Sequence, residues 1–94
     1  VNETMRLMRG GAFPSWHECS PAAAVDLAAI GAPVLAMWMN STGPGHVAVI
    51  EPHDVTDWRK ATVAQAGRVC GTGIRLDRAF GEHRLTMLDF WTHD

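Results

Sequence analysis

Cysteine is scarce in this chain, where Cys19 and Cys70 are the only two among 94 residues. They form neither a C-x-x-C pair nor a doublet of the type that binds a metal ion. A single disulfide between them stays open, because the spacing of two cysteines decides nothing for or against it. The cysteines therefore do not indicate whether the protein works in a reducing or an oxidising compartment.

Long apolar runs and an excess of charge of one sign are lacking as well. The longest apolar run, 32–39, is far shorter than the roughly 20 residues that cross a bilayer as a helix. Eight basic and ten acidic residues give a net charge of −2 and are scattered along the chain. This pattern lacks the basic footprint of a nucleic-acid-binding domain. We expect neither a membrane nor a nucleic acid among the partners.

Metal-ligand spacing is also missing. The five histidines do not pair at the i, i+4 spacing of helical zinc motifs, and no cysteine doublet accompanies them. A metal site stays a minor alternative that a zinc assay on the purified protein would decide. We expect no metal and no cofactor.

Size and composition are typical of one small soluble domain with a modest core. Hydrophobic residues make up 47% of the chain and charged residues 19%. The chain starts at Val1 without an initiator methionine, enters helix-like sequence at once and shows no apolar segment of the signal-peptide type. We therefore predict a single domain over 1–94 that is truncated at its N-terminus.

The order of apolar patterns predicts helices first and strands after them. Residues 1–9 carry apolar side chains at near-helical intervals before Gly10-Gly11. Ser20-Pro21 is a typical helix start, and Gly31 stops that second helix. We predict strands at 34–39, 46–51, 61–66 and 84–91, loops at 12–17, 52–60 and 68–73, and one helical turn at 75–80. This order indicates an α+β domain with an antiparallel sheet and helices on one side.

The stretch 43–52 holds the main candidate for chemistry, His46. Gly43-Pro44-Gly45 is strong turn chemistry, the next residues are apolar and β-branched, and Pro52 stops the strand. A histidine at the mouth of a strand can carry protons or bind a metal. The plainer alternative is a half-exposed histidine that follows a hairpin turn.

Gln65 is the predicted partner of His46. The loop after the second strand is short enough for a hairpin, so strands 46–51 and 61–66 are expected to run antiparallel. If Glu51 pairs with Thr62, His46 and Gln65 become diagonal neighbours on one face. Gln65 would then orient the imidazole as the third member of a catalytic triad. The alternatives are that Gln65 points to solvent, or that Glu51 is the orienting acid, although it lies at the other end of the strand.

The nucleophile is the part of the triad that the sequence supplies least well. Cys19 precedes the Ser20-Pro21 helix start, and a helix N-terminus lowers the pKa of a thiol. Cys19 is therefore a candidate nucleophile, against the alternative of a buried, unreactive thiol. Cys70 lies in a glycine-containing loop with no helix behind it and is a weaker candidate.

Three segments together resemble a known family. They are Ala32-Pro33-Val34-Leu35-Ala36-Met37-Trp38-Met39-Asn40, Gly43-Pro44-Gly45-His46-Val47-Ala48-Val49 and Ala64-Gln65-Ala66-Gly67. The chain from about 16 to 91 resembles the papain-like cysteine hydrolases of bacterial cell walls, the NlpC-like and CHAP-like amidases and endopeptidases. The resemblance implies a papain-like antiparallel sheet of about four strands with N-terminal helices packed on it. It also implies that His46 is the general base and that Gln65 orients it.

The same resemblance implies a function and shows one departure. The substrate would be a peptidoglycan stem peptide, cleaved by acyl transfer through a Cys–His–polar triad in a bacterial or phage protein that acts at the cell wall. The family's nucleophile helix resembles 1–8 better than 20–30, so its cysteine would fall just before Val1. The alternative is a catalytically inactive cell-wall or partner-binding module on the same fold. In that case Trp16, Trp38, Trp58 and Trp91 would offer stacking surfaces, although we expect Trp38 and Trp91 to lie in the core.

Overall fold

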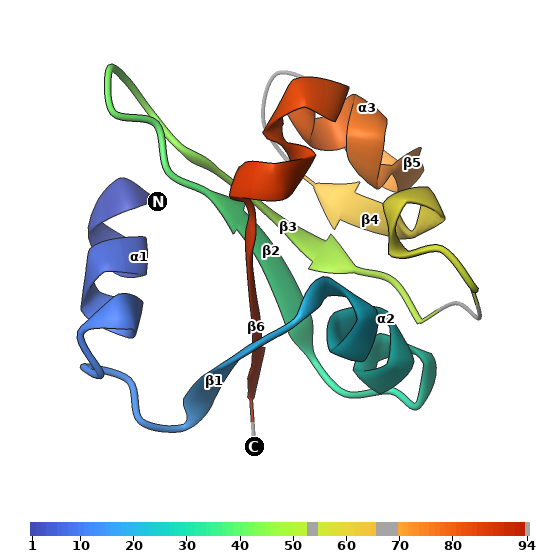
Figure 1. Ribbon diagram of the computed structural model, residues 1–94, viewed down its shortest axis with the longest axis horizontal. Coiled ribbons are helices and arrows are strands. Elements are labelled where there is room, and N and C mark those ends of the chain that lie inside the picture. The colour runs from blue at the N-terminus through green and yellow to red at the C-terminus, as the bar shows by residue number, and fades with distance from the viewer. Residues whose placement is uncertain (53–54, 66–69, 94) are drawn as a thin grey trace.

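Six antiparallel strands form one sheet in the computed structural model, which describes residues 1–52, 55–65 and 70–93 (Figure 1). The strand order across the sheet is β1-β6-β2-β3-β4-β5. The strands are β1 (Trp16–Cys19), β2 (Val34–Trp38), β3 (His46–Ile50), β4 (Thr62–Gln65), β5 (Gly71–Arg75) and β6 (Asp89–His93). The protein is therefore an α+β domain dominated by its sheet.

The prediction of about four strands in a papain-like arrangement, with the helices on one side, is wrong. β1 falls in and after a segment predicted as loop, and it is only four residues long. β5 contains Gly71 and Gly73, which both have positive φ values, and glycine is a weak strand former. β1 is held by pairing with β6, and β5 is held by pairing with β4. Local sequence propensity does not indicate such pairing.

The last predicted strand, 84–91, is only partly correct. Glu82–Met87 forms a 3₁₀ helix (η2), and strand pairing begins at Asp89. A second 3₁₀ turn, η1 (Trp58–Lys60), lies within a segment that was predicted as a loop. The predicted turn at 75–80 is confirmed as α3 (Leu76–Phe80).

The two N-terminal helices are confirmed as α1 (Asn2–Arg9) and α2 (Pro21–Ala29). The hydroxyl of Ser20 accepts a hydrogen bond from the backbone N–H of Ala23 at 3.2 Å, which is the expected N-cap. The helices do not share one side of the sheet. α1 covers one face, and α2 and α3 lie on the other (Figure 1).

Strand alternation divides the core into two clusters. On the α1 face, Met5 and Met8 pack against Met37 and Trp91. On the opposite face, α2 packs against strand residues such as Ala36. The other buried members of this second cluster are Ala24, Val25, Ala28, Val34, Ala48, Ile50, Ala61, Val63, Leu76, Phe80, Leu85 and Phe90. Successive residues of β2 therefore point into different clusters, as a strand period of two requires.

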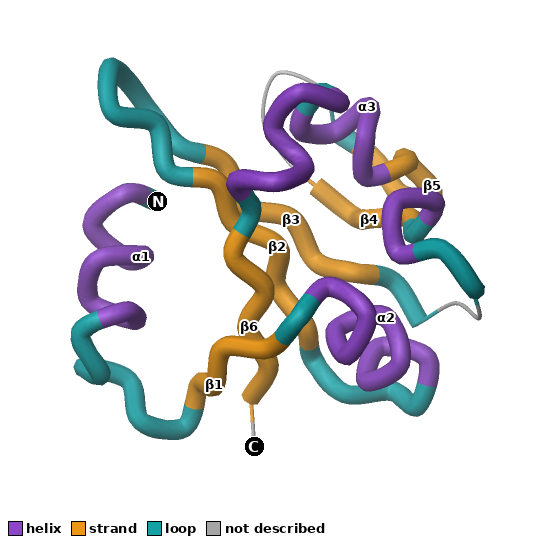
Figure 2. Tube along the Cα trace, viewed as in Figure 1, coloured by secondary structure: helices purple, strands orange, loops and turns teal. Residues whose placement is uncertain are grey.

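β6 lies between β1 and β2, so these two strands are parallel to one another but not adjacent (Figure 2). α2 makes the crossover between them. In the described part of the chain, no helix has the length and apolar character needed to cross a membrane.

Candidate functional site

His46 begins β3 at the end of the β2–β3 hairpin, directly opposite Trp38. Its ring lies on the face that carries α2 and α3, and its centroid is 4.9 Å from that of Phe80 on α3. The turn before it is held by Asn2 of α1, whose side-chain amide donates to the carbonyls of Asn40 and Gly43 at 2.7 and 2.9 Å. The backbone of His46 is thus fixed by the sheet on one side and by α1 on the other.

The predicted register of β3 and β4 is confirmed. Val49 pairs with Ala64 and Ile50 with Val63, and the N–H of Glu51 donates to the carbonyl of Thr62 at 3.0 Å. This register places Gln65 diagonally across from His46. The two side chains meet, with Nε2 of His46 2.5 Å from Oε1 of Gln65. The alternative in which Gln65 points to solvent does not describe this structure.

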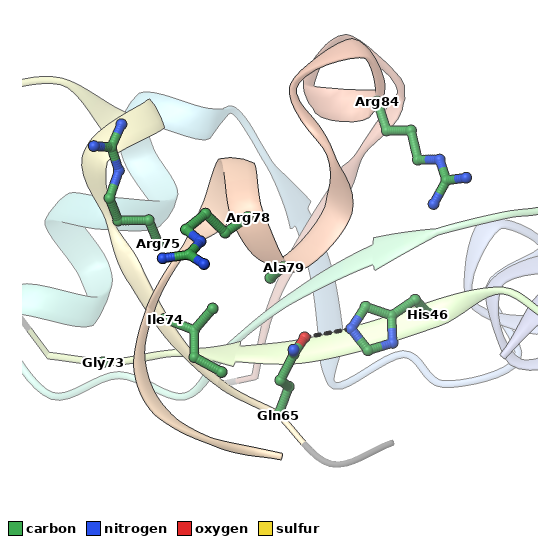
Figure 3. Close-up of a pocket in the computed structure, with 8 residues that line it drawn as sticks. All are labelled: His46, Gln65, Gly73, Ile74, Arg75, Arg78, Ala79 and Arg84. Carbon is green, nitrogen blue, oxygen red and sulfur yellow. Dashed lines mark hydrogen bonds between the residues drawn. The ribbon is translucent and has the colours of Figure 1, made fainter. Parts of the chain in front are cut away.

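A cavity of about 690 Å³ opens beside this pair (Figure 3). Gln65 and His46 form part of its sheet wall, and α3 and η2 form the helical wall above them. Its lining residues are His46, Gln65, Gly73, Ile74, Arg75, Arg78, Ala79 and Arg84. The volume is in the range of sites that hold small molecules or short peptides.

Cys19 is not at this cavity. It is the last residue of β1 and pairs with Phe90 on β6. Phe90 pairs with Ala36 on β2, and Ala36 pairs with Ala48 on β3. Three strand spacings of about 4.8 Å put Cys19 roughly 14 Å from β3. Its Sγ donates to the carbonyl of Phe90 at 3.7 Å. Burial, with a smaller contribution from the charge of Glu18, raises the pKa of the Cys19 thiol above its ordinary value, the opposite of what activates a nucleophile.

Cys70 is exposed and lies directly before β5. Its neighbour Gly71 pairs with Gln65, so β4 separates Cys70 from β3. Two strand spacings correspond to roughly 10 Å. Cys70 does not line the cavity beside His46.

Glu51 lies at the far end of β3 from His46. Its Oε1 accepts a hydrogen bond from the backbone N–H of Gly73 at 2.6 Å. This position agrees with the reason for discounting Glu51 as the orienting acid.

The arginines of the cavity were not among the residues predicted to form the site. The segment 75–80 was predicted only as one helical turn, and Arg84 was placed in a strand. The guanidinium carbon of Arg84 instead lies 3.9 Å from the centroid of the Trp38 ring, and Arg78 projects from α3 at the same cavity. The basic residues at 75, 78 and 84 were the available signal, but only the fold brings them beside His46.

No group of three or more metal-binding side chains comes together within the ranges 1–52, 55–65 and 70–93. Comparison with known proteins adds no identity, since no family model, no curated protein and no solved structure matches this chain. The functional argument therefore rests on the site geometry, in which the His46 imidazole is hydrogen-bonded to the Gln65 amide at the wall of an open cavity.

Proposed function

We propose that this chain is the histidine-bearing part of a cysteine amidase or peptidase that acts on peptidoglycan stem peptides. The observation that carries the proposal is the 2.5 Å contact between His46 and Gln65 beside the cavity. A ring held by a fixed hydrogen bond loses little entropy when it transfers a proton, and this is the arrangement that general acid–base catalysis uses.

The contact also supports separate roles for the two ring nitrogens of His46. The amide oxygen of Gln65 can only accept a hydrogen bond, so Nε2 carries the hydrogen in this pairing. In a neutral imidazole, Nδ1 is then the atom that can take a proton. Gln65 is a positioning residue, because it acts on the substrate only through His46.

In the proposed reaction, Nδ1 of His46 takes the proton from a cysteine thiol, and the thiolate adds to the carbonyl carbon of the substrate amide. The imidazolium then gives the proton to the leaving nitrogen as the C–N bond breaks. Water hydrolyses the thioester that remains, with His46 as its base. Each step needs a thiol within hydrogen-bond reach of His46.

The start of α1 supports a source for this thiol. Val1 and Gln65 line a common hollow, and Asn2 is bonded to the turn that precedes His46, so the start of α1 lies at the His46 end of the sheet, while the body of α1 covers the face opposite to the His46 ring. A residue directly before Val1 would lie at the same end of the sheet as His46. This is also where the family resemblance implies the nucleophile.

The test uses the full-length protein that contains these 94 residues, with peptidoglycan and its soluble stem-peptide fragments as substrates. Mass spectrometry of the products reports each hydrolysed amide. We expect His46→Ala to lower kcat/KM by at least about 100-fold. We expect Gln65→Leu to lower kcat by at least about tenfold with little change in KM. The matched control is His83→Ala, because His83 is exposed and lies outside the cavity lining.

Two results would contradict the proposal. One is hydrolysis by His46→Ala at the wild-type rate. The other is a wild-type activity that survives complete alkylation of the protein's cysteines, because the reaction has no other nucleophile.

A non-catalytic binding module is the second candidate function. It is favoured by the finding that neither cysteine in the described part of the chain lies near His46. This function predicts that peptidoglycan fragments bind without being cleaved, and that binding survives His46→Ala.

A further inference from the structure

The lining of the His46 cavity includes three arginines and no acidic residue. Arg75 is paired with Asp77, at 2.9 Å between guanidinium and carboxylate. Neither Arg78 nor Arg84 pairs with a carboxylate among the described residues. Two other acidic groups lie nearby: Glu82 begins η2 but is outside the cavity lining, and Glu51 is bound to the N–H of Gly73 at the opposite end of β3 from His46. The cavity is therefore cationic at its His46 end, in a chain whose net charge is −2.

Arg84 is positioned as a rigid donor. Its guanidinium carbon lies 3.9 Å from the centroid of the Trp38 ring. Stacking on an aromatic face fixes the guanidinium plane and leaves the N–H groups at its edge available for a bidentate acceptor. Trp38 is the direct strand partner of His46, so Arg84 is about one strand spacing, roughly 5 Å, to the side of the imidazole.

Arg78 approaches the same space from α3. It lies two residues before Phe80, whose ring contacts His46. In Figure 3, Arg78 and Arg84 lie on the helical side of the cavity and the His46–Gln65 pair lies on the sheet side. A ligand in the cavity beside His46 is therefore within a space lined by the guanidinium groups of Arg78 and Arg84.

We propose that Arg78 and Arg84 bind a free carboxylate of the ligand, which makes the preferred ligand an acidic peptide with that carboxylate one or two residues from the amide that faces His46. This inference rests on the proposed function for the amide at His46. A lone inorganic anion would leave most of the roughly 690 Å³ unfilled, whereas a short peptide fills it. Ile74 and Ala79 supply apolar wall for the remainder of such a ligand.

The test is a binding measurement with a matched pair of ligands on the full-length protein. Stem-peptide fragments with free carboxylates are compared by calorimetry with the same fragments after conversion of those carboxylates to carboxamides. We expect the free acids to bind roughly tenfold to a hundredfold more tightly, as a charge-assisted bidentate contact predicts. Raising the salt concentration should reduce this preference.

Arginine variants test which residues cause the preference for the free acid. Arg78→Gln and Arg84→Gln should each reduce it several-fold, and the double variant should abolish it. Arg84→Lys should restore it only in part, because an ammonium lacks the bidentate fork. Arg59→Gln is the matched control, since Arg59 also stacks on a tryptophan, Trp58 at 4.8 Å, but lies outside the cavity lining. Arg78 is exposed, so its variant remains informative if Arg84 variants fold poorly.

The outcomes separate this inference from the proposed function. Equal affinity for the acid and the amide, a preference kept by the double variant, or no binding of either ligand would each overturn the inference. Competition by inorganic phosphate as strong as that of the acidic peptide would also overturn it, in favour of a general anion site. If the wild-type protein cleaves neither ligand and His46→Ala still binds the acid selectively, the inference is supported and the proposed hydrolase function is contradicted. Cleavage of both ligands at equal rates would support the proposed hydrolase and contradict the preference for a free carboxylate.

Discussion

Asp89 on β6 accepts two hydrogen bonds from the guanidinium of Arg9, at 2.7 Å from Nε and 2.9 Å from Nη2. This bidentate pair ties the end of α1 to the start of β6. The hydrogen bond to Asp89 is the main reason that the pKa of Arg9 is raised above its ordinary value. The Asp89 side chain is 11% exposed and that of Arg9 45%, so the carboxylate depends on its partner more than the guanidinium does.

Loss of Arg9 should therefore destabilise the fold. We expect Arg9→Met to lower the free energy of unfolding by about 1–3 kcal/mol, because it leaves a buried carboxylate without its charged donor. Urea denaturation followed by tryptophan fluorescence measures this change. Arg6→Met is the control on the same helix, since the Arg6–Glu3 pair is exposed, and its cost should stay under about 0.5 kcal/mol. Equal costs for the two variants would contradict the assignment.

Asn2 should control the turn that precedes His46. Its side chain makes three hydrogen bonds to the turn, two donated to carbonyls and one accepted from the N–H of Asn40 at 2.9 Å. We expect Asn2→Ala to lower the free energy of unfolding by about 1–3 kcal/mol, because it leaves part-buried backbone groups unpaired. Thr4→Ala, an exposed change on the same helix, is the control.

Gly45 makes the close approach of Asn2 possible. A Cβ at this position would lie 2.5 Å from both Oδ1 of Asn2 and the carbonyl oxygen of Trp38. Gly45→Ala in the Asn2→Ala background should therefore cost less than Gly45→Ala alone, because one of the two clashes is gone. Additive costs would show that the two positions are independent.

The thiol of Cys19 should have a higher pKa than an ordinary thiol. Burial raises its pKa above the ordinary thiol value of about 8.5. We expect the rate of alkylation by iodoacetamide, measured by mass spectrometry on Cys70→Ser, to rise with an apparent pKa above this value. On Cys19→Ser, the exposed Cys70 should react faster at neutral pH. An apparent pKa for Cys19 below that of an ordinary thiol, about 8.5, would reopen its role as a nucleophile.

The same shift predicts the sign of a stability effect. The folded-state pKa of Cys19 is raised above the unfolded value, so the protonated thiol contributes its stability in full below the unfolded pKa. That contribution is lost as the pH rises through the folded pKa. Replacement by Ser should therefore flatten the decline in stability above about pH 8.5, the ordinary thiol region.

Local patterns predicted the elements that local chemistry determines. Ser20 caps α2 because its hydroxyl faces the N–H of Ala23, three residues ahead in the same helix. The antiparallel pairing of β3 and β4 followed from their short connection, and the assumed register, with Glu51 opposite Thr62, placed Gln65 against His46. Both inferences depend on residues close in sequence, or on two strands joined directly.

Pairing between distant segments was not predictable in the same way. β1 becomes a strand because β6, more than 70 residues later, supplies its hydrogen-bonding partner. The segment 84–91 alternates like a strand, yet Leu85 is buried in the core from a 3₁₀ helix. The arginine cluster was missed for the same reason, since Arg84 reaches Trp38 only through the tertiary fold.

The insertion of β6 between β1 and β2 has a consequence for how the sheet assembles. Both flanking strands are complete before residue 40, but each lacks a hydrogen-bonded neighbour on that side until residues 89–93 arrive. A chain emerging from the ribosome would carry two unpaired strand edges for the span of some fifty residues. Such non-local closure raises the contact order and slows folding, which makes the nascent form the stage at which this domain is most exposed to aggregation and to chaperone capture.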